Sequence, residues 1–337
     1  MKFEELRKKL VRDAAQKRIP IAVEIELTPY CNLKCKMCYM REDSLKKELT
    51  TREWLDIIKE ARNNGMVFCL FTGGEIFTRK DFIEIYQETY DLGVMISLFT
   101  NGTLVTKEII EVFKKRPPES ISITLYGGSN ETYYKITGDN KGFDKVKQGI
   151  ALLKQVKTRL VVRTIAIYEI YQDLENIFNY VDKEELAINY SLYVGPRRDA
   201  CNRDIERLAP SDLIKYEQFF KARTKVESYD EYKYSANGFQ CVSGKAAYFI
   251  TWDGYMTPCA MLGTPRLKIE NDLKDVWLDF QKEMAKIAKC SLCDACQYHD
   301  ECLQCPAKRY LEGSFSECSA YLEEVARLRY EDRHGKI

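Results

Sequence analysis

Histidine is almost absent from this chain, which has only His299 and His334. Histidine-based catalysis and zinc–histidine sites are therefore not expected. No apolar run approaches the roughly 18 residues that indicate a membrane-spanning helix. The net charge is only +1, which gives no bulk electrostatic reason to bind nucleic acid or an anionic membrane. The first residues contain acids and no apolar stretch, so we expect no signal peptide and a cytoplasmic protein.

Cysteine, by contrast, is abundant, with 13 in 337 residues. Where no export signal is expected, this number indicates metal or redox centres rather than a disulfide framework. The length predicts about two domains. A hydrophobic content of 45% and a charged content of 31% are typical of a globular protein with an ample core.

The first cysteines lie in a loop directly after a predicted strand. Residues 21–27 form an apolar run between two prolines, and Cys31, Cys35 and Cys38 follow it. A structural zinc site normally needs four ligands, and no fourth cysteine or histidine is near. A cube-shaped iron–sulfur cluster held by only three thiolates keeps one iron open for a substrate or cofactor. Three packed core cysteines are the alternative, but polar residues between them do not fit a core pattern.

Apolar runs alternate with amphipathic helices through the first part of the chain. Strands are expected at residues 21–27, 67–72, 94–100, 120–126, 160–167 and 187–194. Helices are expected at residues 2–17, from a Thr50–Glu53 capping box to Gly65, and at 80–92, 107–115, 142–157 and 173–181. Such strands suit a parallel sheet covered by helices. Because six repeats are too few for a closed eight-fold barrel, the expected fold is α/β with a partial (β/α)6 TIM-like barrel.

Polar residues stand at several of the predicted strand ends, where α/β proteins collect their functional loops. Gly73, Gly74 and Glu75 end the second strand; the glycines let a ligand approach the backbone, and the carboxylate can accept from an ammonium group. Asn101 ends the third strand in an Asn-Gly pair that could equally be a simple turn. Arg163 in the fifth strand needs an anionic partner if it points inward; a surface position is the alternative.

A second set of cysteines begins at residue 241. Asp253-Gly254 between two apolar runs predicts a hairpin that brings Cys241 and Cys259 within reach of one metal centre. A helix is expected at 271–289. The cysteines after it are Cys290, Cys293, Cys296, Cys302, Cys305 and Cys318. The C-x2-C-x5-C-x2-C spacing of Cys293, Cys296, Cys302 and Cys305 could bind zinc, although the middle gap is short. The Cys-Pro pair resembles the end of a ferredoxin motif with different upstream spacing.

The cysteine loop and the Gly-Gly-Glu turn resemble the radical S-adenosylmethionine (SAM) superfamily, which also uses a partial barrel. The resemblance implies that Cys31, Cys35 and Cys38 hold a [4Fe–4S] cluster and that SAM chelates the fourth iron. The positions that it assigns to SAM binding are Gly73, Gly74, Glu75, Asn101, Ser122 and Arg163. Met37 and Ile76 depart from the usual pattern, which often has an aromatic residue and a proline there.

The later cysteines are similar to the SPASM extension of radical SAM enzymes, and Gly254-x4-Cys259 matches its Gly-x4-Cys element. This resemblance implies one auxiliary [4Fe–4S] cluster on Cys293, Cys296, Cys302 and Cys318. It implies another on Cys241, Cys259 and Cys305, with an open iron or with Cys290 as a further ligand. Zinc at these positions is the alternative.

These observations divide the chain into four parts. An N-terminal helix occupies 1–19, the partial barrel 20–195, a bridging region 196–240, and the SPASM domain, with a β-hairpin and a C-terminal helix, 241–337. The bridging region is polar, with a helix expected from Ser211 to about residue 223. It also contains Cys201, which we interpret as a free thiol.

The resemblance implies an enzyme that cleaves SAM reductively to a 5′-deoxyadenosyl radical, which takes hydrogen from a substrate. The expected substrate is a ribosomal peptide that becomes cross-linked, thioether-bridged, epimerised or oxidised. Expected partners are this substrate, an electron donor such as flavodoxin or ferredoxin, and a separate leader-peptide-binding protein, because the first strand begins near residue 20. The alternatives are the same chemistry on a sulfatase-like protein or a small-molecule alcohol, and a non-catalytic metal-binding module.

Overall fold

The computed structural model describes residues 3–40, 47–198, 206–224, 241–270, 272–288, 290–302 and 305–335. Cys201 lies outside these ranges. The first part of the chain comprises α1 (Phe3–Lys17), β1 (Ala22–Glu26), α2 (Thr51–Asn63), β2 (Phe68–Thr72), η1 (Ile76–Thr78), α3 (Phe82–Asp91), β3 (Met95–Thr100), α4 (Lys107–Lys115) and β4 (Ser120–Thr124). It continues with α5 (Asn130–Thr137), α6 (Gly142–Leu153), β5 (Arg159–Ile165), α7 (Tyr168–Gln172), α8 (Leu174–Lys183), β6 (Ala187–Ser191) and α9 (Pro210–Arg223).

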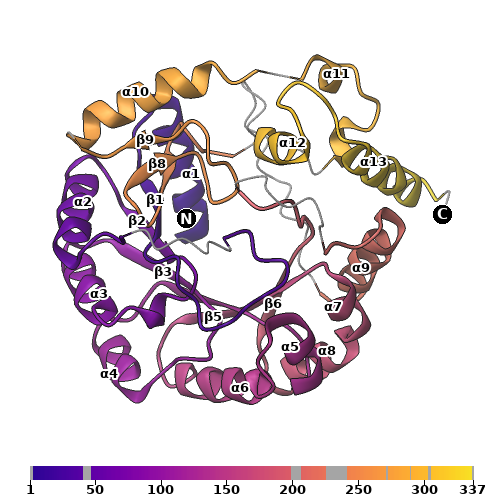
Figure 1. The fold of residues 1–337 in the computed structure, drawn as a ribbon, viewed down its shortest axis with the longest axis horizontal. Helices are drawn as coiled ribbons and strands as arrows, with labels where there is room; N and C mark the ends of the chain where they lie inside the picture. Colours follow the sequence, from indigo (N-terminus) through magenta and orange to yellow (C-terminus); the bar gives the residue numbers. More distant parts are fainter. Residues whose placement is uncertain are drawn as a thin grey trace.

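Strands β1 to β6 form the parallel sheet that the sequence predicts, with neighbours in chain order. Their connecting helices form a ring around the outside of the sheet (Figure 1). The sheet is a partial barrel, as expected. Helices α5 and α7 were not predicted, and α9 begins at Pro210 with Ala209 as its N-cap rather than at Ser211.

The open edge of β1 is extended by the C-terminal part of the chain. Strand β7 (Ala247–Ile250) pairs in parallel with β1, and the predicted hairpin continues the sheet through β8 (Tyr255–Thr257) to β9 (Leu267–Lys268). The result is one nine-stranded sheet in the order β6-β5-β4-β3-β2-β1-β7-β8-β9. The second cysteine region is therefore joined by a backbone ladder to the strand that carries the first cysteine loop.

The two faces of the barrel sheet differ in chemistry because side chains alternate along a strand. On β1, Val23 and Ile25 are buried in the hydrophobic core with Trp54 of α2. Glu24 and Glu26 take the alternate positions and point to the inner face. Residues such as these give the barrel a polar interior beneath the strand ends.

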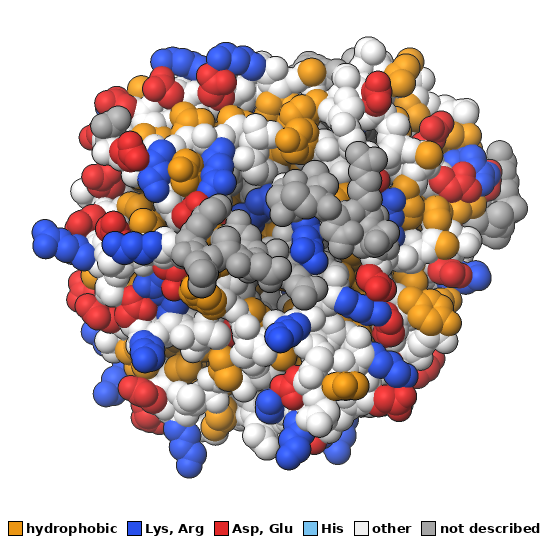
Figure 2. Space-filling model, viewed as in Figure 1, with side chains coloured by type: hydrophobic (Ala, Val, Ile, Leu, Met, Phe, Trp, Pro, Cys, Tyr) orange, Lys and Arg blue, Asp and Glu red, His pale blue; other side chains and the backbone are white. Residues whose placement is uncertain are grey.

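The remaining helices are α10 (Leu273–Ala285), α11 (Ser291–Asp294), η2 (His299–Glu301), α12 (Pro306–Glu312) and α13 (Ala320–Arg333). Helix α13 packs on α9 beside the barrel (Figure 1), where Arg329 and Glu217 form a buried ion pair with a 2.6 Å hydrogen bond. Basic and acidic side chains are interspersed over the face drawn in Figure 2. None of the described helices is long and apolar enough to cross a membrane.

Candidate functional site

The first cysteine loop, residues 28–39, leaves the carboxyl end of β1 and is fixed to a neighbouring helix. The N–H groups of Lys34 and Lys36 donate to the carbonyls of Thr137 and Ile136 at the end of α5. The Lys36 side chain also forms an ion pair with Glu169 of α7. Helix α5, which the sequence did not reveal, thus supports the loop between Cys31 and Cys38.

The three thiols of this loop lie close enough to influence one another. Burial, followed by charge on Glu75 and Cys38, raises the pKa of Cys31 to about 11, and burial with charge on Cys38 and Cys31 raises that of Cys35 to about 12. Burial also raises the pKa of Cys38. The metal-free thiols are therefore protonated at neutral pH and must release protons when they bind metal.

Four of the cysteine sulfurs accept a hydrogen bond from the backbone N–H of the residue two positions later in the chain. The pairs are Leu33 with Cys31, Met40 with Cys38, Ser243 with Cys241, and Met261 with Cys259. The Leu33 nitrogen lies 3.4 Å from the Cys31 Sγ. Such donors stabilise thiolates and tune iron–sulfur clusters. This pattern fits cluster ligands better than cysteines packed as small apolar groups.

The Gly-Gly turn after β2 is pressed against the cysteine loop. The N–H of Gly74 donates to the Thr28 carbonyl over 2.8 Å. A Cβ on Gly74 would lie only 2.2 Å from the Tyr30 carbonyl oxygen, and one on Gly73, whose φ is +145°, 2.6 Å from that of Thr28. Only glycine permits this approach at either position, so the turn and the loop together form one surface.

Glu75 lies behind this surface and connects the ends of β2 and β3. It is 1% exposed, and its carboxylate accepts hydrogen bonds from the Thr100 hydroxyl at 2.7 Å and from the N–H groups of Asn101 at 2.6 Å and Phe77 at 3.2 Å. Burial raises the pKa of Glu75 to about 7 although these hydrogen bonds lower it. Three of about four acceptor positions are thus used within the protein.

Asn101, for which the sequence left a simple turn open, contacts the cysteine loop. Its Nδ2 lies 3.8 Å from the Cys31 Sγ and donates to the Asn32 Oδ1 over 2.9 Å. Asn32 in turn donates to the Thr103 hydroxyl over 2.8 Å. The end of β3 is therefore part of the site.

Ser122 and Arg163 lie deeper in the barrel on its inner face. Ser122 is buried on β4, opposite Phe99 of β3. The Arg163 guanidinium lies 4.5 Å from the centre of the Phe99 ring, so Arg163 points inward. Its Nε is buried and has no hydrogen-bond partner among the described residues. Burial raises the pKa of Glu24, and Arg163 opposes this rise, so the two face each other across the interior.

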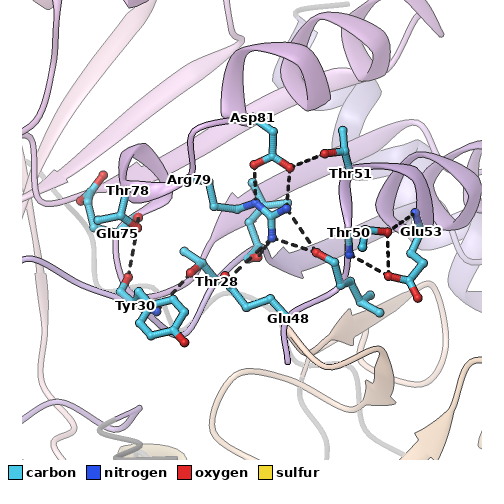
Figure 3. A network of polar contacts seen from close by, with 12 residues as sticks. Thr28, Tyr30, Glu48, Thr50, Thr51, Glu53, Glu75, Thr78, Arg79 and Asp81 are labelled. Atoms are coloured by element: carbon cyan, nitrogen blue, oxygen red, sulfur yellow. Dashed lines mark hydrogen bonds and ion pairs between the residues drawn. The ribbon is translucent and has the colours of Figure 1, made fainter. Parts of the chain in front are cut away.

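Two further residues, which the sequence motifs did not identify, support the cysteine loop. The Tyr126 hydroxyl, just after β4, hydrogen-bonds to the Cys35 sulfur. Arg79 donates to the carbonyls of Leu27 at 3.0 Å and Leu49 at 3.2 Å, which lie on either side of the loop segment, and to Asp81 at 2.6 Å (Figure 3). No motif marks these positions, because their partners are backbone and sulfur atoms distant in the sequence.

The first auxiliary set comprises Cys241, Cys259 and Cys305. Burial and charge on Cys305 raise the pKa of Cys241 to about 11 and of Cys259 to about 12. The hairpin and the start of α12 therefore bring these three thiols within electrostatic reach of one another.

The second auxiliary set lies around α11, α12 and the start of α13. Burial, Glu323, Cys290 and Cys296 raise the pKa of Cys318, whereas Arg309 lowers it. The buried Arg309 also places Nη1 3.7 Å from the Cys293 Sγ. None of the 12 described cysteines forms a disulfide. Among the described residues, no three His, Cys, Asp or Glu side chains are arranged to hold a single metal ion.

A buried ion pair joins the cysteine loop to the first auxiliary set. The Arg198 guanidinium donates to both carboxylate oxygens of Glu26, at 2.5 and 3.1 Å. The backbone N–H of Arg198 donates to the Tyr39 carbonyl over 3.3 Å. Its Nε donates to the carbonyl of Ala260, the residue after Cys259, over 2.8 Å. Burial opposes the charge of Arg198, but Glu26 raises its pKa overall.

Comparison with known proteins agrees with this geometry. Residues 25–181 match the profile of the radical SAM superfamily. The AdoMet-dependent heme synthase of Methanosarcina barkeri is 26% identical over 354 residues, which cover 96% of this chain and 99% of that protein. The sporulation killing factor maturation protein SkfB of Bacillus subtilis is 23% identical over 269 residues, covering 77% of this chain and 65% of SkfB.

Solved structures show the same fold. SuiB of Streptococcus suis bound to its precursor peptide SuiA has a TM-score of 0.70 at 17% identity, with 95% of this chain and 81% of that chain covered. AnSMEcpe with bound AdoMet has a TM-score of 0.69 at 18% identity, covering 93% and 96%. Superfamily members bind a [4Fe–4S] cluster and SAM, and the three-thiol loop with its N–H donors and glycine turn fits both. Residues 25–181 of this chain therefore form a radical SAM domain.

Proposed function

We propose that this protein is a radical SAM/SPASM enzyme that modifies a ribosomally made peptide. The observation that carries the proposal is the convergence of three thiols in a loop against a glycine turn, together with two further groups of thiols. A site with only three protein ligands leaves one position for an external ligand. When bound, the cluster and SAM supply a 5′-deoxyadenosyl radical that takes a hydrogen atom from the substrate.

The chain's own residues bind and orient these groups. Cys31, Cys35 and Cys38 hold the cluster, with Asn101 donating to the Cys31 sulfur. The Gly73–Gly74 backbone would hold the amino group of SAM. Glu75 acts mainly as a positioning residue, because most of its acceptor positions are already used by protein donors.

The inner face of the barrel binds the rest of SAM. Arg163 has a buried Nε that lacks a partner within the described part of the chain, so it suits the SAM carboxylate. Ser122 shares this face and can donate to the same ligand. The walls of the barrel exclude water from the radical, which protects it from side reactions.

The auxiliary sets would hold further iron–sulfur clusters, which would supply an electron acceptor or a binding position for a substrate group. The first set is Cys241, Cys259 and Cys305, and the second is Cys293, Cys296, Cys302 and Cys318. The Glu26–Arg198 pair fixes the first auxiliary set relative to the radical-generating loop. An external donor such as flavodoxin or ferredoxin supplies the initiating electron.

The peptide assignment is supported by similar proteins whose names or structures refer to peptides or their maturation. SuiB, which was solved with its precursor peptide, shares the fold over 95% of this chain. SkfB is named as a maturation protein. The proposed product is a cross-linked, thioether-bridged, epimerised or oxidised peptide.

The experiment supplies the anaerobically reconstituted enzyme with SAM, a reductant and a candidate precursor peptide. We expect 5′-deoxyadenosine to form and the peptide to lose the mass of one hydrogen molecule. In an epimerisation, it would instead gain deuterium from heavy water. A Cys35→Ala variant serves as the inactive control. Abundant nucleoside with no change in any peptide tested, but with conversion of a small molecule, would contradict the peptide assignment.

A small-molecule substrate is the second candidate, because the match to the heme synthase spans nearly the full length of both proteins. In that case a haem precursor, and not a peptide, should stimulate SAM cleavage. A cysteine-containing sulfatase-type peptide tests the maturase-like alternative, since anSMEcpe was also solved with cysteine peptides. The three substrates can be compared in one assay by their effect on the rate of nucleoside formation.

A further inference from the structure

The inner face of the barrel is not completely covered by neighbouring side chains. On β1, β2, β3 and β5, half-buried residues mainly alternate with buried ones. Two of the buried residues on β1, Val23 and Ile25, belong to the core beneath the outer helices. Because side chains alternate along a strand, the half-buried residues are those that point into the barrel. The interior below the strand ends is therefore partly accessible to a ligand.

Two carboxylates on β1 point into this interior, and they differ in their partners. Arg198 donates to both oxygens of Glu26. Glu24, the next inward position toward the start of the strand, accepts no hydrogen bond and forms no ion pair within the described part of the chain. Its neighbours in register are Leu70 of β2 and Phe249 of β7, which are both apolar. The described residues thus provide a direct partner for one acid but not for the other.

Arg163 on β5 is the cation that faces Glu24. Burial raises the pKa of Glu24 and Arg163 opposes this rise, yet the two side chains do not form an ion pair. The Arg163 guanidinium lies 4.5 Å from the centre of the Phe99 ring, and its buried Nε has no hydrogen-bond partner among the described residues. In the proposed function, the SAM carboxylate occupies Arg163. A carboxylate removed from bulk water is unfavourable without a cation or N–H donors, so Glu24 then requires a partner from another ligand.

The position of Glu24 separates it from the residues assigned to the SAM amino group. Glu24 pairs in register with Leu70, which lies three residues before Gly73 in the turn after β2. At about 3.3 Å per residue, Glu24 lies roughly 10 Å below this turn along the strand. A group that contacts Glu24 must therefore extend from the strand ends into the barrel. Such a depth suits a long side chain of a substrate.

We propose that Glu24 binds a lysine or arginine side chain of the peptide substrate inside the barrel. The ammonium or guanidinium group neutralises the carboxylate and donates charge-assisted hydrogen bonds to it. The methylene stem of such a side chain packs beside apolar residues such as Leu70. Glu26 is not available for this role, because Arg198 already binds both of its oxygens. The inference rests on the peptide substrate of the proposed function and specifies a cationic residue within it.

The test measures the binding of blocked peptides of the form acetyl-Gly-Xaa-Gly-amide, in which Xaa is lysine, arginine or norleucine. Each peptide is added to the reconstituted enzyme with SAM, and its affinity is determined by isothermal titration calorimetry. Norleucine keeps the apolar stem and lacks the charge. We expect the lysine and arginine peptides to bind roughly tenfold more tightly than the norleucine peptide, as is typical of a hydrogen bond to a charged group. Glu24→Gln should abolish this difference, whereas Glu24→Asp should retain part of it.

The matched control is Glu88→Gln, because Glu88 lies exposed on α3 outside the barrel, and this variant should keep the preference for cationic peptides. Equal or undetectable binding of the lysine and norleucine peptides by the wild type would overturn the proposal, as would a preference that survives in Glu24→Gln. A loss of about tenfold in the affinity for SAM itself in Glu24→Gln would also overturn it, since Glu24 would then bind SAM. Failure of the wild type to form 5′-deoxyadenosine with SAM and a reductant would instead count against the proposed function, and not against the binding role of Glu24.

Discussion

Replacing Arg79 with methionine removes the clamp that holds both sides of the first cysteine loop. The guanidinium is 7% exposed and donates to the Leu27 and Leu49 carbonyls and to both oxygens of Asp81. Removing one partner of such a buried pair costs roughly 3–5 kcal/mol, because the other charge loses its compensation. Partial exposure of Asp81 places the expected loss toward the lower end. Arg79→Lys keeps the positive charge but lacks the forked guanidinium, so this variant should lose less unfolding free energy than Arg79→Met.

The assay is urea unfolding of the metal-free protein, followed by circular dichroism. Burial raises the pKa of Asp81, but Arg79 and Thr51 lower it overall, below its ordinary value of 3.8. The stabilisation from Asp81 is therefore present above about pH 4 and is lost as the pH falls through the lowered pKa. The difference in unfolding free energy between wild type and Arg79→Met should narrow as the pH falls below about 4.

The matched control is Arg52→Met, because Arg52 is 92% exposed and lies 3.8 Å from Asp56. Exposed pairs of this kind contribute about 0–1 kcal/mol. Equal stability of Arg79→Met and Arg52→Met at neutral pH would refute the clamp. A stability gap that does not change with pH would refute the assigned role of Asp81.

Three further substitutions test other parts of the site. Gly74→Ala should weaken SAM binding, measured by equilibrium dialysis, because the alanine Cβ would overlap the cysteine loop. The control is Gly263→Ala, whose Cβ would make only ordinary contacts, so this variant should bind SAM normally. Arg309→Met should lower the reduction potential of the second auxiliary cluster, because a positive charge beside the Cys293 sulfur stabilises the reduced form. Each 1.4 kcal/mol of this stabilisation that is lost corresponds to roughly 60 mV for a one-electron couple, measured by a spectroscopic redox titration. Arg198→Met should lower the free energy of unfolding by roughly 3–5 kcal/mol, and the added Glu26→Gln change should recover part of it; independent, additive losses would contradict the pair.

The sequence predicted the barrel because its strands and helices carry strong local signals. The Thr50–Glu53 capping box formed as expected, and α4 has the predicted bounds. The polar interior was harder to see, since Glu24 and Glu26 interrupt an apolar run that reads as a buried strand. The direction of the Arg163 side chain was likewise ambiguous from the sequence, because only the strand register shows which face of the sheet it occupies.

Supporting residues could not be predicted, because their partners are distant in the sequence. Arg79 acts on backbone carbonyls that have no sequence signature. Arg198 meets Glu26 only after the chain has completed six strands. The pairing of β7 with β1 likewise depends on tertiary packing, since neither strand's residues specify a partner. Motifs identified cysteines, whereas the structure showed which of them face one another.

The most direct test of the account is to reconstitute the protein anaerobically and measure iron, sulfide and zinc together with reductant-dependent 5′-deoxyadenosine formation from SAM. We predict about twelve irons with matching sulfide, and nucleoside that is lost in Cys35→Ala but kept in Cys69→Ala. Zinc without sulfide, and no nucleoside under reducing conditions, would contradict the assignment of an enzyme and leave a metal-binding module.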